Sequence, residues 1–156
     1  MPRPLERRSI VASLFDRLTD NEPANSREVP PPEWDQRESY RLSVARDLTN
    51  LLNARRNEAD IPEEFELTRD SILAYGLQDF TVAPVDRETV RRSVERTIRR
   101  FEPRLSRVQV AVTESNVFTY SFRISAVLRV ELSAEPVVFD ASLPIESRRF
   151  RVMTGR

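Results

Sequence analysis

Apolar positions along the chain follow two different periods. Up to residue 101 they recur every three or four positions, which is typical of the buried face of a helix. Beyond residue 103 they recur every second position, which is typical of the buried face of a strand. Because the helices precede the strands instead of alternating with them, the pattern predicts an α+β fold, an antiparallel β-meander covered by α-helices.

A short amphipathic helix and a proline-rich linker are predicted at the N-terminus. Ser9 can cap a helix that runs to Leu18, and its apolar stripe includes Leu14, Phe15 and Leu18. The polar stretch TDNEPANSREVPPPEWDQ follows and favours an extended linker. We therefore predict two parts, residues 1–36 as helix and linker and residues 37–156 as the α+β domain. The helix can fold back on the core or dock on another chain, which makes these three apolar residues candidates for partner binding.

Two further helices and one helical turn are predicted before the sheet. The helix from Arg37 to Arg56 has one apolar face and one charged face. A helical turn follows, with Thr68 as its cap and Gly76 as its C-terminal stop. The last helix has Asp86 as its cap and ends near Phe101. Its apolar stripe comprises Val90, Val94, Thr97, Ile98 and Phe101, and arginines cover the rest, as expected of a solvated face.

Three strands are predicted after Pro103. The alternation covers residues 108–112, a very long stretch from 120 to 132, and residues 137–143. The C-terminal stretch SRRFRVMTGR adds either an edge segment or a tail. An antiparallel meander exposes unpaired backbone at its edges, so one edge is expected to accept a strand from a neighbouring protein.

Composition narrows the functional classes. Lys plus Arg and Asp plus Glu number 25 each, and a net charge of zero argues against a nucleic-acid binder or a protein steered to anionic lipid. All the basic residues are Arg, which a GC-rich genome or a use in bidentate interface pairs would explain. Cys and His are absent, so any catalysis would rest on carboxylates or hydroxyls, and no metal or cofactor site is predicted. With no signal peptide and no long apolar run, the chain is expected to stay in the cytoplasm, without membrane insertion.

The turn FEPRL between the last helix and the first strand has an unusual composition. Pro103 disfavours helical backbone at Glu102, so the helix must end there. If the triplet is extended, the side chains of Glu102 and Arg104 leave the backbone on the same side and form a rigid fork of acceptor and donor. Such a fork suits charge-assisted pairing with a partner. The alternative is a helix stop with a surface ion pair of little energetic value.

The order of motifs resembles a known family. SLFDRLTD, ARDLTNLLNARR, YGLQDF and VERTIRRFEPRLSRVQV, followed by FRISAVL, are similar to the TssE family of type VI secretion baseplate wedge subunits, which is related to the lysozyme-like wedge proteins of contractile phage tails. The likeness runs from about Ser13 to Leu143, and its most specific part is Glu102-Pro103-Arg104. It implies a fold like the handshake domain of the sheath protein and a baseplate contact at this triplet.

The resemblance also implies partners and a place in the cell. They are the wedge subunits TssF and TssG, with TssK as a further partner, and the sheath subunits TssB and TssC, whose polymerisation the protein would start. The complex would be docked at the inner membrane from the cytoplasmic side.

Two other functions compete with this interpretation. The lysozyme-like label suggests a peptidoglycan-cleaving enzyme, with Glu95, Glu102 and Glu114 as carboxylate candidates. However, no route to peptidoglycan is evident without a signal peptide, so a non-catalytic assembly subunit is predicted. The arginine-rich helix suggests nucleic-acid binding, but glutamates interrupt its arginines and no aromatic stacking platform accompanies it.

Overall fold

The computed structural model describes residues 33–56, 64, 67, 71–78, 86–113, 118–130 and 133–155. The predicted helix from Ser9 to Leu18, the proline-rich linker, Thr68 and Glu114 lie outside these residues. The chain is divided into two compact units, Met1–Val44 and Ala45–Arg156. Helix α2 (Glu33–Asn53) begins in the first unit and ends in the second. The last two residues of the first unit, Ser43 and Val44, are buried.

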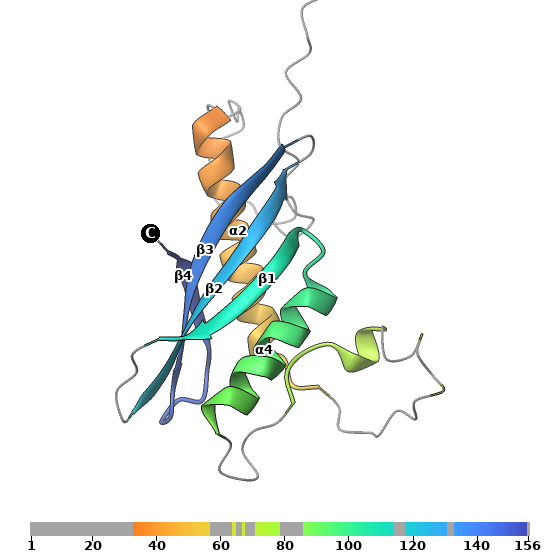
Figure 1. Cartoon of the computed structure of the whole chain (residues 1–156), viewed down its shortest axis with the longest axis vertical. Helices are drawn as coiled ribbons and strands as arrows, with labels where there is room; N and C mark the ends of the chain where they lie inside the picture. Colours follow the sequence, from red (N-terminus) through yellow and green to blue (C-terminus); the bar gives the residue numbers. More distant parts are fainter. Residues whose placement is uncertain are drawn as a thin grey trace, which may run out of the picture. The chain divides into compact units, whose positions relative to one another are not determined.

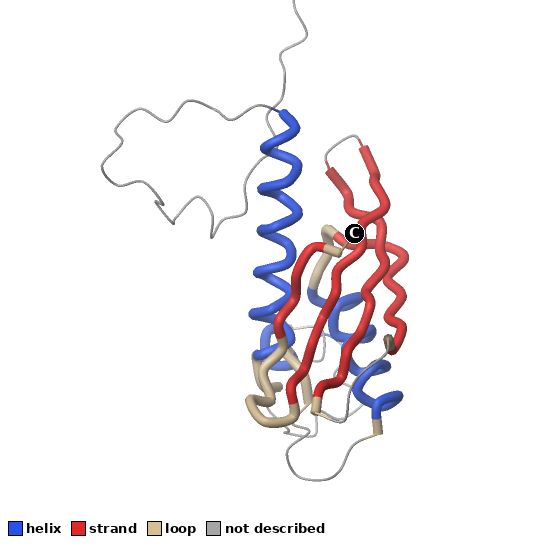
Figure 2. Tube along the Cα trace, turned by 90° about the vertical axis from the view of Figure 1, so that its left-hand side faces the viewer, coloured by secondary structure: helices blue, strands red, loops and turns tan. Residues whose placement is uncertain are grey.

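The second unit has the predicted α+β architecture (Figure 1). It contains the second half of α2, a 3₁₀ turn η1 (Ile72–Ala74), helix α4 (Arg87–Phe101) and strands β1 (Leu105–Val112), β2 (Thr119–Val130), β3 (Ser133–Pro144) and β4 (Arg151–Thr154). The four strands form one antiparallel sheet in the order β1-β2-β3-β4. Figure 2 shows these strands side by side. The fold class predicted from the period of the apolar residues is therefore confirmed.

Alternation along the strands puts the apolar side chains on one face of the sheet, as predicted. In β2 every second residue from Phe122 to Val130 is buried, and β3 continues this layer with Val137, Phe139 and Ala141. The stripe of α4 supplies Val90, Val94, Thr97 and Ile98 to the same core, and Phe101 is half-buried. Asp86 caps α4 by accepting a hydrogen bond from the backbone N–H of Thr89 at 3.0 Å, also as predicted.

The sheet is longer and wider than the sequence suggested. β1 begins at Leu105, three residues earlier than expected, because a β-bulge with Arg107 at φ 52° restores the alternation before Val108. β3 extends over Ser133–Pro144 because it pairs with β2 along its whole length. Of the two alternatives for the C-terminal stretch, the structure has the edge strand, β4.

The observed ends of α2 also differ from the predicted ones. The helix begins at Glu33 and ends at Asn53 instead of covering residues 37–56. It stops because Arg56 donates its backbone N–H to Leu77 O at 2.8 Å, and Leu77 donates its own to Ala54 O at 2.8 Å. Gly76 permits this contact: its φ is +103°, and a Cβ there would lie 2.3 Å from Ala54 O. Gly76 therefore ends the short turn as predicted and also joins it to the end of α2.

Candidate functional site

The Glu-Pro-Arg triplet forms a tight turn between α4 and β1. Glu102 is the C-cap of α4, and its backbone N–H still donates to Ile98 O at 2.9 Å. The backbone N–H of Leu105 then donates to Glu102 O at 3.1 Å, and the backbone N–H of Arg129 in β2 donates to Arg104 O at 2.8 Å. Pro103 lies exposed at the tip. The helix therefore ends where the proline predicted, and the backbone enters the sheet at once.

Within the turn, the carboxylate of Glu102 and the guanidinium of Arg104 bind each other. Arg104 donates from Nε to Glu102 Oε1 at 2.7 Å and from Nη2 to Glu102 Oε2 at 2.6 Å, which is a bidentate pair. The backbone N–H of Arg104 adds a third bond to Oε1 at 3.2 Å. Glu102 is only 4 % exposed. The two side chains do meet on one side of the backbone, but the carboxylate is buried instead of projecting as an open prong.

Asp47 completes this arrangement from the second half of α2. Arg104 Nη2 also donates to Asp47 Oδ2 at 2.7 Å, so one guanidinium bridges two carboxylates. Burial alone would lower the pKa of Arg104, but the hydrogen bonds that Arg104 donates to Glu102 and Asp47 outweigh this effect and raise the pKa above its ordinary value. We call Asp47, Glu102 and Arg104 the acid–arginine cluster. Sequence reasoning missed Asp47, because no pattern links it to a residue 57 positions away.

An aromatic pair lies beside the acid–arginine cluster. The rings of Tyr75 and Phe101 meet edge to face with centroids 5.5 Å apart. Burial raises the pKa of the Tyr75 hydroxyl, and the negative charges of Asp47 and Glu102 raise it further. Ile72 in η1 is largely exposed, and the guanidinium of Arg100 lies 5.6 Å from the centroid of Phe101. Tyr75, which is 38 % exposed, thus gives the cluster an aromatic neighbour that a partner could contact.

One row of charged residues on α4 does more than form a solvated face. Arg99 donates to Val108 O from Nη2 at 2.7 Å and from Nε at 3.1 Å, and Arg91 Nη1 donates to Val110 O at 3.0 Å. Between them Glu95 Oε2 accepts the backbone N–H of Val110 at 3.2 Å. The helical spacing of Arg91, Glu95 and Arg99 sets all three along β1. Figure 1 shows α4 running beside this edge strand. Some of the charged side chains of this arginine-rich helix therefore bond to the backbone of β1, which the sequence did not reveal.

The opposite edge of the sheet is capped by polar residues of α2. Thr49 Oγ1 accepts the backbone N–H of Val152 at 3.2 Å. Asn53 accepts the backbone N–H of Phe150 at 2.9 Å and donates to Phe150 O at 2.9 Å. At both edges of the sheet, backbone groups are thus bonded by side chains of a helix. Fewer backbone groups are therefore left to pair with a strand of a neighbouring protein than the sequence led us to expect.

The remaining predicted site residues divide into two groups. Leu14, Phe15 and Leu18 lie outside the described residues, as does Glu114 among the catalytic candidates. The other two candidates, Glu95 and Glu102, each accept hydrogen bonds from arginine, whereas the acid of a glycosidase lies in an apolar pocket. Within the described ranges, no group of three potential metal ligands comes together. No helix there has the length and apolar character needed to cross a membrane.

Comparison with known proteins identifies the family. The model of the baseplate wedge protein gp25 family matches residues 38–133, more than half of the chain. This range runs from α2 through β2 and includes the whole acid–arginine cluster. No curated protein and no solved structure matches the chain. On the family match, this chain belongs to the baseplate wedge protein gp25 family, a structural family of phage-like baseplates that includes TssE of type VI secretion.

Proposed function

We propose that the chain is the TssE-type wedge subunit of a type VI secretion baseplate. In this role it assembles with TssF and TssG, contacts TssK, and starts polymerisation of the sheath subunits TssB and TssC. It acts as a non-catalytic subunit on the cytoplasmic side of the inner membrane. The family membership supports a baseplate role, and the order of motifs in the sequence supports the type VI system in particular.

The acid–arginine cluster is the observation that carries this proposal. Its three charged groups lie on α2, at the end of α4 and at the start of β1, so a partner that contacts them would touch three elements of the fold at once. Arg104 is 21 % exposed and remains accessible, whereas Glu102 is buried and holds it in position. Pro103, exposed at the tip, fixes the turn. We propose Glu102, Pro103 and Arg104 as partner-binding residues, together with Leu14, Phe15 and Leu18 of the N-terminal part, residues 1–36.

The test is co-purification with TssF and TssG from cells that express all three chains. We expect a stable complex with the wild type and a loss of about 2 to 5 kcal/mol in binding with Arg104→Ala, because the truncation leaves a partner charge unpaired at a buried interface. Arg92→Ala is the matched control, since Arg92 is an exposed arginine that pairs with Glu88 on α4. If both variants bind equally well, the triplet is not part of the interface.

A separate measurement addresses catalysis. Purified wild-type protein is incubated with peptidoglycan, and we expect no release of soluble fragments. Release that disappears in Glu95→Gln or Glu102→Gln would instead establish a lysozyme-type enzyme.

The absence of complex formation with TssF and TssG for the wild type would leave the family assignment intact but overturn the assignment to the type VI system.

A further inference from the structure

The backbone of β1 has a row of hydrogen-bonding groups that face away from the sheet. Thr113 donates its N–H to Ser121 O at 2.9 Å, so residues 109, 111 and 113 are the ones that bond to β2. In an antiparallel pair the bonding residues alternate, so the N–H and C=O groups of Val108, Val110 and Val112 point outward. The sheet order makes β1 an edge strand, with no strand on that side among the described residues. This row has the geometry that pairs with another extended strand.

Three of these outward groups are occupied by side chains of α4. They are Val108 O, Val110 N–H and Val110 O, which are bonded by Arg99, Glu95 and Arg91 respectively. The three side chains also bind each other: Glu95 Oε2 lies 2.7 Å from Arg91 Nη1, and Glu95 Oε1 lies 2.6 Å from Arg99 Nη2. We call Arg91, Glu95 and Arg99 the edge cap. Glu95 is its central member, because it contacts both arginines and the backbone.

The capped groups are the ones that self-pairing would need. Two copies of β1 related by a two-fold axis would pair antiparallel, with Val110 opposite its own equivalent. The N–H and C=O of Val110 would then form the central pair of bonds, and Val108 would bond to Val112 of the other copy. The edge cap occupies both groups of Val110 and the carbonyl of Val108. A second copy of this chain is therefore the strand whose pairing the cap opposes most directly.

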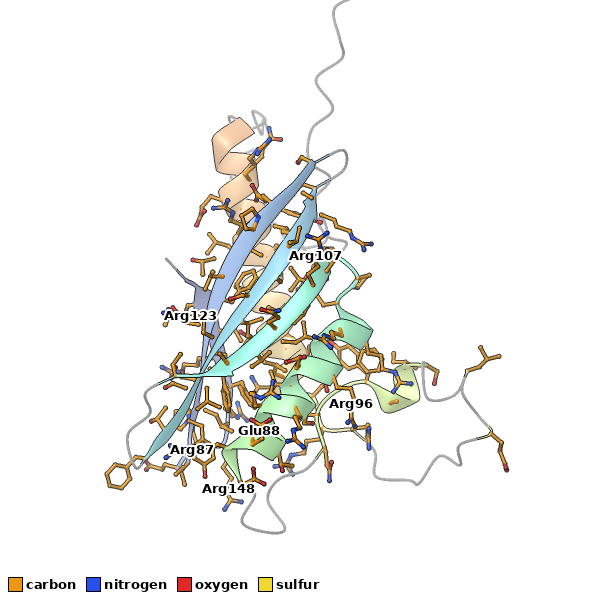
Figure 3. All side chains as sticks on the ribbon, viewed as in Figure 1. Arg87, Glu88, Arg96, Arg107, Arg123 and Arg148 are labelled. Atoms are coloured by element: carbon orange, nitrogen blue, oxygen red, sulfur yellow. The ribbon has the colours of Figure 1, made fainter. Side chains whose placement is uncertain are left out.

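One other feature at the same edge acts in the same direction. The bulge at Arg107 disrupts regular pairing next to Val108, and bulges are a common way of protecting an exposed edge (Figure 3 labels Arg107). Charged side chains at an edge disfavour pairing because a neighbouring strand would have to displace them from water and from their own ion pairs. Val112, at the other end of the row, is 38 % exposed, and the three capping bonds go to Val108 and Val110 instead of to it.

We infer that the edge cap keeps a strand-pairing surface on β1 closed and thereby prevents the chain from associating with itself. The arginine-rich helix then has a function beyond solubility. Its row of Arg91, Glu95 and Arg99 substitutes for the missing neighbouring strand with bonds inside the chain. The inference does not depend on the baseplate role, because it concerns the behaviour of the isolated protein.

The test compares two double variants of equal charge. Glu95→Ala with Arg99→Ala removes the centre and one arm of the edge cap. Arg123→Ala with Asp140→Ala removes an exposed ion pair of 3.1 Å between β2 and β3 that contains no residue of β1 or of the edge cap. Neither double variant changes the net charge. Sedimentation equilibrium over a range of concentrations measures self-association of each full-length chain, and circular dichroism checks that each is folded.

We expect the cap variant to associate at least about tenfold more tightly than the wild type, with the control like the wild type. Hydrogen exchange should show that the amides of Val110 and Val112 become more protected as the concentration of the cap variant rises. A folded cap variant that associates no more than the control would overturn the inference. So would an association in which the β1 amides gain no protection, because the contact would then lie elsewhere.

A milder variant keeps the test decisive if the double variant is poorly folded. Arg99→Ala truncates a side chain that is 56 % exposed and releases Val108 O alone. A fluorescent peptide of residues 105–113 serves as the probe strand, and fluorescence anisotropy measures its binding. Tighter binding to Arg99→Ala than to the wild type and to Arg92→Ala supports the cap, and equal binding to all three overturns it.

Discussion

Glu102 occupies a position where a carboxylate is unfavourable on local grounds. At the C-terminal end of a helix the dipole disfavours negative charge by about 0.3–1 kcal/mol. The structure offsets this with two bonds from the guanidinium of Arg104 and one from its backbone N–H. The local sequence thus suggested a use outside the chain, whereas tertiary contacts give Glu102 a use within it. Both roles can coexist, because Arg104 also reaches Asp47 and is partly exposed.

The burial of Glu102 changes the expected cost of removing it. As an exposed pair, Glu102 and Arg104 would contribute less than about 1 kcal/mol to folding. Because Glu102 is 4 % exposed and paired, Glu102→Ala should lower the free energy of unfolding by about 1–3 kcal/mol. Urea denaturation measures this loss. Glu88→Ala, which removes an exposed carboxylate of α4, should cost much less, and equal losses for the two variants would contradict the buried role of Glu102.

The same measurement qualifies the test of partner binding. A Glu102→Ala protein that fails to bind TssF and TssG is informative only at a temperature well below its unfolding midpoint. The same check applies to Arg104→Ala, because this variant leaves the buried carboxylate of Glu102 without its guanidinium partner.

Helix α4 organises its charges by position. At its start Asp86 caps the helix and Glu88 binds Arg91 and Arg92, in the first turn where the dipole favours carboxylates. Along its middle the edge cap bonds to β1. Arg96 lies on a side of the helix turned away from β1 (Figure 3). One element thus serves as core, as edge protection and as solvent-facing surface, which its high arginine content alone would not distinguish.

The first turn of α4 should make stability depend on pH in the acid range. Hydrogen bonds from Thr89 hold the pKa of Asp86 below its ordinary value, and those from Arg91 and Arg92 lower the pKa of Glu88 to about 2. A lowered pKa in the folded state means that the unfolded chain takes up protons first, so this stability is present above the ordinary pKa values and is lost as the pH falls through the lowered ones.

The corresponding experiment follows the urea midpoint from about pH 6 down to about pH 2. The double variant Asp86→Asn with Glu88→Gln should show a smaller fall than the wild type, since neither amide titrates. An identical fall in both proteins would mean that these two carboxylates do not couple to folding.

At the scale of the whole molecule, the sheet is completed by strands beyond the family match. The match ends at residue 133, whereas β3 continues to Pro144 and β4 pairs outside it. The new outer strand is short and receives hydrogen bonds from Thr49 and Asn53. Each of the two sheet edges is therefore associated with a helix, β1 with α4 and β4 with the second half of α2. Any strand that a sheath subunit adds must use backbone groups outside these caps or displace them.

The N-terminal part should contribute to assembly more than to folding. The strands, α4 and their buried side chains belong to the second unit, and the apolar stripe of residues 9–18 follows the sequence pattern of a docking helix. Deletion of residues 1–32 should leave the thermal midpoint within a few degrees of the wild type, about the shift expected for a change below 1 kcal/mol, while it weakens binding to TssF and TssG. A large fall in the midpoint would show that this part belongs to the core.

Periodicity by itself determined the class of this fold. The change from a helical to an alternating pattern at Pro103 located α4, β1 and β2, because burial on one face imposes a period that does not depend on distant partners. Local chemistry likewise determined the cap at Asp86, the stop at Gly76 and the end of α4, since each depends on a few neighbouring residues. The motif order also pointed to the family that the match to residues 38–133 confirms.

Only the tertiary structure decided what the charged and polar side chains contact. Asp47 reaches Arg104, Arg99 reaches Val108, and Asn53 reaches Phe150 through bonds that are absent from any local pattern. The same holds for the fourth strand and for the true end of α2, which depend on pairing with β3 and on the close approach of Gly76 to Ala54. The physical reason is the reach of each interaction. Apolar burial leaves a periodic trace along the chain, whereas an arginine can pair with any acceptor within a few ångströms, and which acceptor that is depends on how the elements pack.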